Sequence, residues 1–116
     1  MAGSPNIITR VSGVNYVSLK TRSFTRMLIA NSDTTDVRVN LVLGESDTAG
    51  GSSVASTDRY ILKDVIIPKG TTLKLEAMDF TRTADTPGTA SSNIDDLTFL
   101  LATTNAAHQV DVSIIR

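Results

Sequence analysis

The stretch from Val37 to Leu43, Val-Arg-Val-Asn-Leu-Val-Leu, decides the fold class, because its apolar residues fall at every second position. Period-two alternation is typical of a half-buried β-strand, in which successive side chains point to opposite faces. The same alternation returns three times toward the end of the sequence, at Leu73/Leu75, at Leu97/Phe99/Leu101 and at Val110/Val112/Ile114. Most of the apolar residues are therefore expected to build strands.

Strand-like segments follow one another at short intervals along the whole chain. No segment of a dozen residues shows the 3.6-residue apolar period of a helix, and the β-branched residues Thr, Val and Ile are abundant. The expected strands lie at residues 7–11, 15–20, 24–31, 37–43, 59–67, 72–78, 97–102 and 109–115. We predict an all-β fold, a single antiparallel β-sandwich (Ig-like or jelly-roll) of about eight strands. Residues 1–12 would form an N-terminal arm with the first strand, and residues 13–116 the sandwich domain.

The composition limits the classes of partner. The 116 residues include no Cys, and 11 basic residues face 12 acidic ones, which gives a net charge of -1. Nucleic-acid-binding surfaces usually carry clustered Lys and Arg, often with stacking aromatic residues, and neither feature is present, so no nucleic-acid partner is expected. The sequence also shows neither the basic and apolar regions of a signal peptide nor an apolar run of about 18 residues, so neither signal-peptide export nor a membrane partner is expected.

Several strands are apolar at consecutive positions and therefore on both faces, which a lone sandwich does not need. We call them the two-faced strands. Such strands require a cover on their second face, supplied by a loop, the N-terminal arm or another subunit. They lie at residues 27–30, 41–43, 65–67, 100–101 and 114–115. Within the strand at 59–67, Tyr60 and Leu62 share one face whereas Val65 and Ile67 share the other, which predicts a β-bulge near Lys63.

The connections differ in character. Asn31-Ser32-Asp33 is typical of a turn, and Ile67-Pro68-Lys69-Gly70 predicts a type I turn with Pro second and Gly fourth. Residues 44–58 and 81–93 are rich in Ser, Thr, Gly, Ala and Asp and offer little to bury. They are either mobile surface loops or loops that become ordered against a partner.

A search for catalytic chemistry finds no assembled group. The single histidine, His108, has no evident partner and is expected to be a structural residue at a strand start or an interface. No Ser or Thr has an evident base, and Gly50-Gly51-Ser52 lacks the Lys and the strand-to-helix context of a phosphate loop. The chain is therefore predicted not to be an enzyme and to need no cofactor or metal.

A ligand-binding module for calcium or sugars is the main alternative class. Calcium could be held by carboxylates in or beside the loops, although the residue spacing of a known calcium-binding loop is missing. These carboxylates are Glu45, Asp47, Asp58, Asp79, Asp85, Asp95 and Asp96. A sugar site would need exposed aromatic rings. Because Phe24, Tyr60 and Phe99 are expected in the core, Tyr16 and Phe80 are the candidates for stacking.

Four motifs of the chain carry a resemblance to a known class. These are Leu28-Ile-Ala-Asn-Ser32, Val37-Arg-Val-Asn-Leu41, the run from Tyr60 through Ile67-Pro-Lys-Gly-Thr-Thr-Leu73, and the closing Val110-Asp-Val-Ser-Ile114. Together they resemble the strand-and-turn pattern of small β-sandwich structural proteins of tailed bacteriophages, over roughly residues 24–116. The loop at 44–58 is longer than that pattern needs, which leaves open a dedicated contact there.

The resemblance implies a capsid decoration (cement) protein on the virion, assembled in the host cytoplasm; the alternative within the class is a tail or neck component. Its implied partners are the major capsid protein and sister copies, in a homo-oligomer such as a trimer, and weak contacts repeated over a lattice can hold through avidity. The expected interface combines the N-terminal arm with one residue or more from most of the two-faced strands: Met1, Ala2, Gly3, Ser4, Pro5, Asn6, Met27, Ile29, Ile66, Leu100 and Ile115.

Overall fold

The structure is a computed structural model, and it describes residues 6–45, 50–54, 59–79 and 97–116. The described chain contains strands and no helix. The eight strands are β1 (Ile7–Ser12), β2 (Val17–Ser18), β3 (Ser23–Ala30), β4 (Val37–Glu45), β5 (Arg59–Ile67), β6 (Thr72–Asp79), β7 (Leu97–Thr103) and β8 (Gln109–Ile115). The predicted all-β class is confirmed, and the expected strand positions agree with these bounds to within a few residues.

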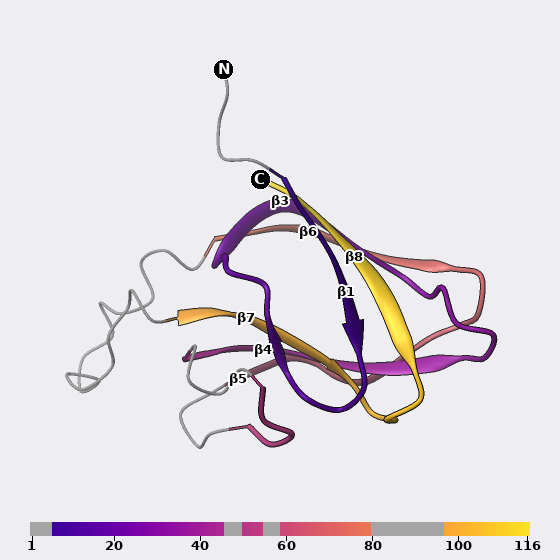
Figure 1. Cartoon of the computed structure of the whole chain (residues 1–116). Coiled ribbons are helices and arrows are strands. Elements are labelled where there is room, and N and C mark those ends of the chain that lie inside the picture. The colour runs from indigo at the N-terminus through magenta and orange to yellow at the C-terminus, as the bar shows by residue number, and fades with distance from the viewer. Residues whose placement is uncertain (1–5, 46–49, 55–58, 80–96) are drawn as a thin grey trace.

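The strands form two four-stranded sheets that pack face to face (Figure 1). One sheet has the order β1-β8-β3-β6 and the other β2-β7-β4-β5, and every neighbouring pair is antiparallel. Most connections pass from one sheet to the other, and among the strands that the structure describes β4 and β5 are the only sequential ones that pair within a sheet. This order is that of the jelly roll rather than of the seven-stranded immunoglobulin sandwich. The predicted β-sandwich is confirmed, and of the two expected topologies, Ig-like and jelly-roll, the strand order is that of the jelly roll.

The alternating residues of the sequence fill the space between the sheets. Val37, Val39 and Leu41 of β4 are fully buried, as are Phe99 and Leu101 of β7 and Val110, Val112 and Ile114 of β8. Phe24 of β3 and Phe99 of β7 meet across the sandwich, with ring centroids 5.2 Å apart and planes tilted by 56°. Burial of this apolar surface is the main stabilising contribution of a chain without disulfide bonds.

The two-faced strands are covered largely from within the chain. Met27 and Ile29 belong to the central core, so the strand β3 turns these residues inward and leaves Leu28 half-buried outside. On the outer face of the other sheet, Val42, Leu100 and Ala102 are covered by Tyr16 and pack against Val54. The expectation that Met27, Ile29 and Leu100 contact another subunit is therefore wrong, because each is at most 1% exposed within this chain.

A short segment holds this internal cover in place. The backbone N–H of Tyr16 donates to the carbonyl of Gly51 at 2.7 Å, and the N–H of Gly50 donates to the carbonyl of Tyr16. Gly50 adopts a φ of +89°, which suits a residue without a side chain. The described part of the loop at 44–58, residues 50–54, thus lies against Tyr16, and this contact brings Val54 over the sheet.

The predicted bulge in β5 is confirmed. The register of β5 against β4 shifts between Val39 and Leu41, and again between Leu41 and Val42. Asp64 takes a left-handed φ of +53°, and its N–H donates to Asn40 Oδ1 at 2.7 Å. The extra residues let Leu62 as well as Ile67 pack against the core, opposite Leu41 and Val37 of β4.

The two expected turns are present, with one change of type. Asn31 Oδ1 accepts the N–H of Asp33, as an Asx turn requires. At the second turn, the N–H of Thr71 donates to the carbonyl of Pro68, and Gly70 has a φ of +74°. The turn therefore spans residues 68–71 with Gly third, which is the type II signature rather than the expected type I.

Candidate interaction surface

The expected N-terminal contact region is only partly described. Met1, Ala2, Gly3, Ser4 and Pro5 lie outside the described residues, whereas Asn6 is exposed and its Oδ1 accepts the backbone N–H of Arg116 at 3.3 Å. This bond joins the start of β1 to the end of β8. The first described residue is therefore fixed at the rim of the β1-β8-β3-β6 sheet.

The outer face of the β1-β8-β3-β6 sheet carries an apolar patch. Ile8 of β1 and Leu28 of β3 both pair with Ser113 of β8, which lies between them. Ile115, two residues further along β8 on the same face, is diagonal to both. We call Ile8, Leu28 and Ile115 the Ile8 patch. Ile8 is 82% exposed, the largest value among the described bulky apolar residues, and Ile115 is 37% exposed.

An ion pair between Arg10 and Asp111 lies on the same face, two residues along the strands from Ile8 and Ser113. Arg10 Nε lies 2.7 Å from Asp111 Oδ1, and Arg10 Nη2 lies 3.3 Å from Asp111 Oδ2. The hydrogen bond from Arg10 lowers the pKa of Asp111, and the same bond raises the pKa of the Arg10 guanidinium. Both groups are solvent-exposed, so the pair adds charge balance more than stability.

A second exposed area lies on the outer face of β4 and β5. Ile66 is 46% exposed and stands opposite Arg38, whose Nη1 donates to the carbonyl of Asp64 at 3.2 Å. Tyr60, expected in the core, is 44% exposed, and Lys63 Nζ lies 5.1 Å from the centre of its ring. That expectation failed because the bulge of β5 changes which residues face inward.

Tyr16 is not available as a sugar-stacking ring. It is 3% exposed, and burial together with a hydrogen bond to Tyr60 raises the pKa of its phenol to about 12. No local sequence pattern indicates that Tyr16 is covered, because residues 50–54 reach it from a distant part of the chain. Phe80, the other stacking candidate, lies outside the described residues.

His108 lies at the end of the sandwich near the turn that begins at Asn31. Its Nε2 is 3.2 Å from Thr35 Oγ1, and its Nδ1 is buried without a hydrogen-bond partner in the described structure. Its backbone carbonyl accepts the N–H of Gly13, and its N–H donates to Asn105. These contacts tie three connections together and agree with a structural position.

Most of the carboxylates proposed as calcium ligands lie outside the described side chains. In the described part of the chain, no three His, Cys, Asp or Glu side chains gather in a way that could hold a metal ion. Of the seven carboxylates proposed as donors, only exposed Asp79 has a described side chain. Outside the described side chains lie Glu45, Asp47, Asp58, Asp85, Asp95 and Asp96.

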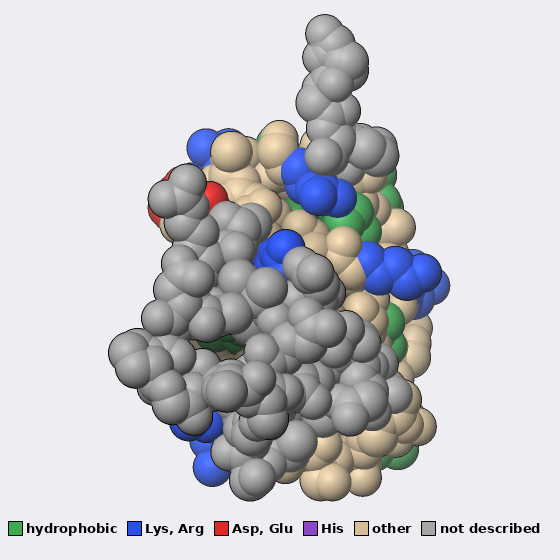
Figure 2. All heavy atoms as spheres, turned by 90° about the vertical axis from the view of Figure 1, so that its left-hand side faces the viewer, with side chains coloured by type: hydrophobic (Ala, Val, Ile, Leu, Met, Phe, Trp, Pro, Cys, Tyr) green, Lys and Arg blue, Asp and Glu red, His purple; other side chains and the backbone are tan. Residues whose placement is uncertain are grey.

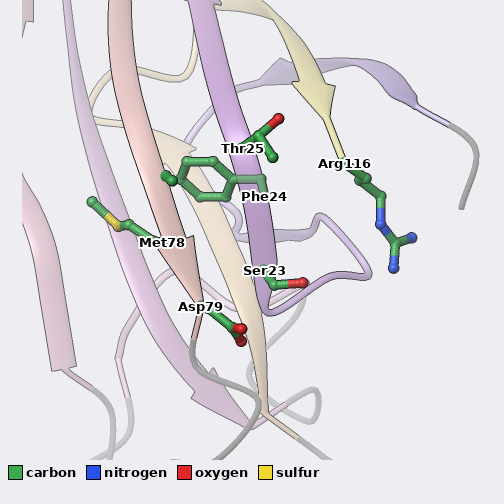
Figure 3. Close-up of a pocket in the computed structure, with 7 residues that line it drawn as sticks. Ser23, Phe24, Thr25, Met78, Asp79 and Arg116 are labelled. Atoms are coloured by element: carbon green, nitrogen blue, oxygen red, sulfur yellow. The ribbon is translucent and has the colours of Figure 1, made fainter. Parts of the chain in front are cut away.

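One hollow, which the sequence did not indicate, opens between the ends of β3 and β6. Its volume is about 380 Å³, and it is lined by Ser23, Phe24, Thr25, Ala77, Met78, Asp79 and Arg116. Phe24 and Met78 lie together on one side, whereas the Arg116 side chain extends away on the other (Figure 3). The Thr25 hydroxyl donates to the carbonyl of Ile115 at 2.9 Å. The lining combines the apolar side chains of Phe24 and Met78 with the cation of Arg116.

Charge is dispersed over the visible surface. Figure 2 shows the Lys and Arg side chains of one face as separate groups rather than one continuous patch. Within the described ranges there is also no helix long and apolar enough to cross a membrane.

Comparison with known proteins adds no assignment. No protein-family model matches the chain, and neither the curated proteins nor the solved structures include a match.

Proposed function

We propose that the chain is a non-enzymatic virion structural protein, a capsid decoration protein that binds the head lattice and sister copies of itself. The observation that carries the proposal is the Ile8 patch. A lone sandwich exposes polar residues on its outer faces, but this sheet presents an isoleucine that is 82% exposed, at the edge next to the N-terminal arm. An apolar side chain so placed suits a protein whose work is done by contact.

The fold supports the proposal by analogy. The eight-stranded jelly roll is a common building unit of viral capsid proteins, although it also occurs in lectins and cupins, so the fold alone does not decide between these classes. Of the residues expected at the interface, Asn6, Ile66 and Ile115 are exposed, and Ile8 joins them. A decoration protein needs such contacts and no catalytic group.

The alternatives have weaker support. A tail or neck component would use the same surfaces and differs only in its partner lattice. A sugar-binding module would need open aromatic rings, but Tyr16 is buried and the Tyr60 ring has Lys63 above it. Thermal-shift measurements with glycans and with calcium test this class, and a stabilisation by either would favour it over the virion proposal.

The direct test is binding to heads of the virus that encodes the chain, prepared without this protein. We expect the purified chain to sediment with the heads and to raise their resistance to heat or low salt. Binding to tails but not heads would move the protein to the tail or neck. A chain that binds neither particle would contradict the proposal.

A variant lacking residues 1–6 tests the arm. We expect weaker binding to heads, with a melting temperature close to that of the full chain. Of the residues that this variant lacks, the structure describes Asn6, which is exposed and accepts one 3.3 Å hydrogen bond from the backbone N–H of Arg116. Loss of this bond should change the stability little. Unchanged binding would show that the arm is not a contact.

A further inference from the structure

The four edge strands of the two sheets are not equally protected against pairing with another chain. Unpaired edges are templates for β-addition, and proteins protect them with shortness, bulges or charges. β2 has two residues, β5 is interrupted by two register shifts, and β6 displays Lys74 and Glu76 along its exposed face. Three of the four edges therefore carry a recognised protection.

The fourth edge, β1, lacks these features. It runs for six regular residues, Ile-Ile-Thr-Arg-Val-Ser, with no Gly, Pro or Lys, and pairs continuously with β8 on one side. Among the residues that the structure describes, no strand lies on its other side. Its one charge, Arg10, is balanced by Asp111 within the same sheet. In Figure 1, β1 forms the free margin of its sheet beside β8.

We propose that two copies of the chain pair β1 against β1, antiparallel across a two-fold axis at Ile8, to make one continuous eight-stranded sheet. The occupant of this edge is a second copy because an antiparallel pair of identical strands is self-complementary. The pairing also places the most exposed isoleucine of each copy directly opposite its counterpart. Side chains opposite each other in such a pair lie about 5 Å apart, so each Ile8 covers the other.

Charge favours this register over its neighbours. With Ile8 opposite Ile8, Arg10 of one copy faces Asn6 of the other, and the two Arg10 residues are separated by about 13 Å along the strands. That separation exceeds the screening length of about 8 Å at physiological salt. A shift of the axis to Thr9 would halve the separation, and a shift to Arg10 would place the two guanidinium groups face to face.

The contact is small. A single strand pair with one apolar patch falls below the roughly 1,200 Å² of a standard protein interface, so the dimer should dissociate on dilution. When two copies of the chain are bound at neighbouring sites of a lattice, the β1–β1 contact between them would form at a high effective concentration. It would therefore hold although it is weak in solution. Dimer formation does not rest on the virion proposal, because the purified chain alone tests it.

The first experiment is sedimentation velocity over a range of concentrations, on the wild-type chain and on two matched variants. We expect a monomer–dimer equilibrium for the wild type, and at least a tenfold weaker dimer for Ile8→Asp. Ile66→Asp, which alters an exposed isoleucine on the other sheet, should leave the dimer unchanged. Circular dichroism checks that both variants keep the β fold.

The second experiment uses the absence of cysteine from the chain. Ile8→Cys should give a covalent dimer with a short bifunctional maleimide, whereas Lys74→Cys should not. Lys74 is the matched control because it lies in the same row of the sheet, at the opposite edge. A wild-type chain that remains monomeric at millimolar concentration, a trimer, or equal cross-linking at both positions would overturn the proposal.

Discussion

Single side chains fix the joints between strands, and Asn31 is the clearest case. It is 5% exposed, its Nδ2 donates to the carbonyls of Thr35 and Ile67, and its Oδ1 accepts the N–H of Asp33. One amide therefore joins the end of β3 to the end of β5 and shapes the turn between β3 and β4. A buried polar group of this kind is costly to remove because its partners lose their bonds without regaining water.

Asn31→Ala should lower the free energy of unfolding by about 2 to 3 kcal/mol, since two carbonyls and one N–H lose a partner. Urea denaturation measures the change. Asn105→Ala is the matched control: the side chain is exposed and its Oδ1 accepts the N–H of Ala107 within a local turn, so the loss should be much smaller. Equal losses for the two variants would contradict the role given to Asn31.

Tyr16 makes the stability of the fold sensitive to alkaline pH. Its phenol has a raised pKa of about 12 in the folded chain, whereas an unfolded tyrosine ionises near pH 10. The folded state therefore holds this proton more tightly, and the corresponding stability is complete below pH 10 and is lost as the pH rises toward 12. Tyr16→Phe should reduce the slope of unfolding free energy against pH in that window, measured by urea denaturation. An unchanged slope would contradict the assignment.

Asp111 provides a titration in the acid range. The hydrogen bond from Arg10 holds its pKa below the ordinary value, so its contribution is present above about pH 4 and is lost as the pH falls through the folded pKa. In Arg10→Ala the pKa of Asp111 should rise toward the ordinary range. Carbon-detected NMR titration measures both values, and the same low pKa in the variant would show that Arg10 is not the cause.

At the scale of elements, the β4–β5 pair depends on one residue in an unusual conformation. Asp64 has a φ of +53°, in a region that glycine adopts freely and β-branched residues avoid. Asp64→Gly should therefore leave stability nearly unchanged, whereas Asp64→Val should cost about 1 to 2 kcal/mol. Urea denaturation of the pair measures this difference, and equal stability of the Gly and Val variants would argue against the bulge.

The elements also show what sequence patterns can and cannot predict. Alternation correctly predicted most of the core residues of β4, β7 and β8, because successive side chains of a strand point to opposite faces. These core residues are Val37, Val39, Leu41, Phe99, Leu101, Val110, Val112 and Ile114. Met27 was misassigned because β3 buries Phe24 and Met27 with two exposed residues between them, which breaks that period. Tyr16 and Leu100 were misassigned because residues 50–54 cover them from a distance in sequence, and no local pattern records such a contact.

At the scale of the whole molecule, the jelly-roll order separates strands that pair in space. β1 pairs with β8 from the opposite end of the described chain, and β3 lies between β8 and β6. Such a sheet closes only after long stretches of chain have been brought together, which costs loop entropy before any contact forms. The same topology places the beginning of β1 and the end of β8 at one rim, where the Ile8 patch is built from strands β1, β3 and β8.

This topology sets the folding rate and separates folding from assembly. We expect refolding in milliseconds to seconds, the range of domains dominated by non-local strand pairs. Stopped-flow circular dichroism measures it, and microsecond folding would contradict the dependence on long-range pairing. The main phase should be independent of protein concentration, because the core is complete within one chain. A slower phase that accelerates with concentration should follow in the wild type and disappear in Ile8→Asp, since edge pairing of β1 requires two folded copies.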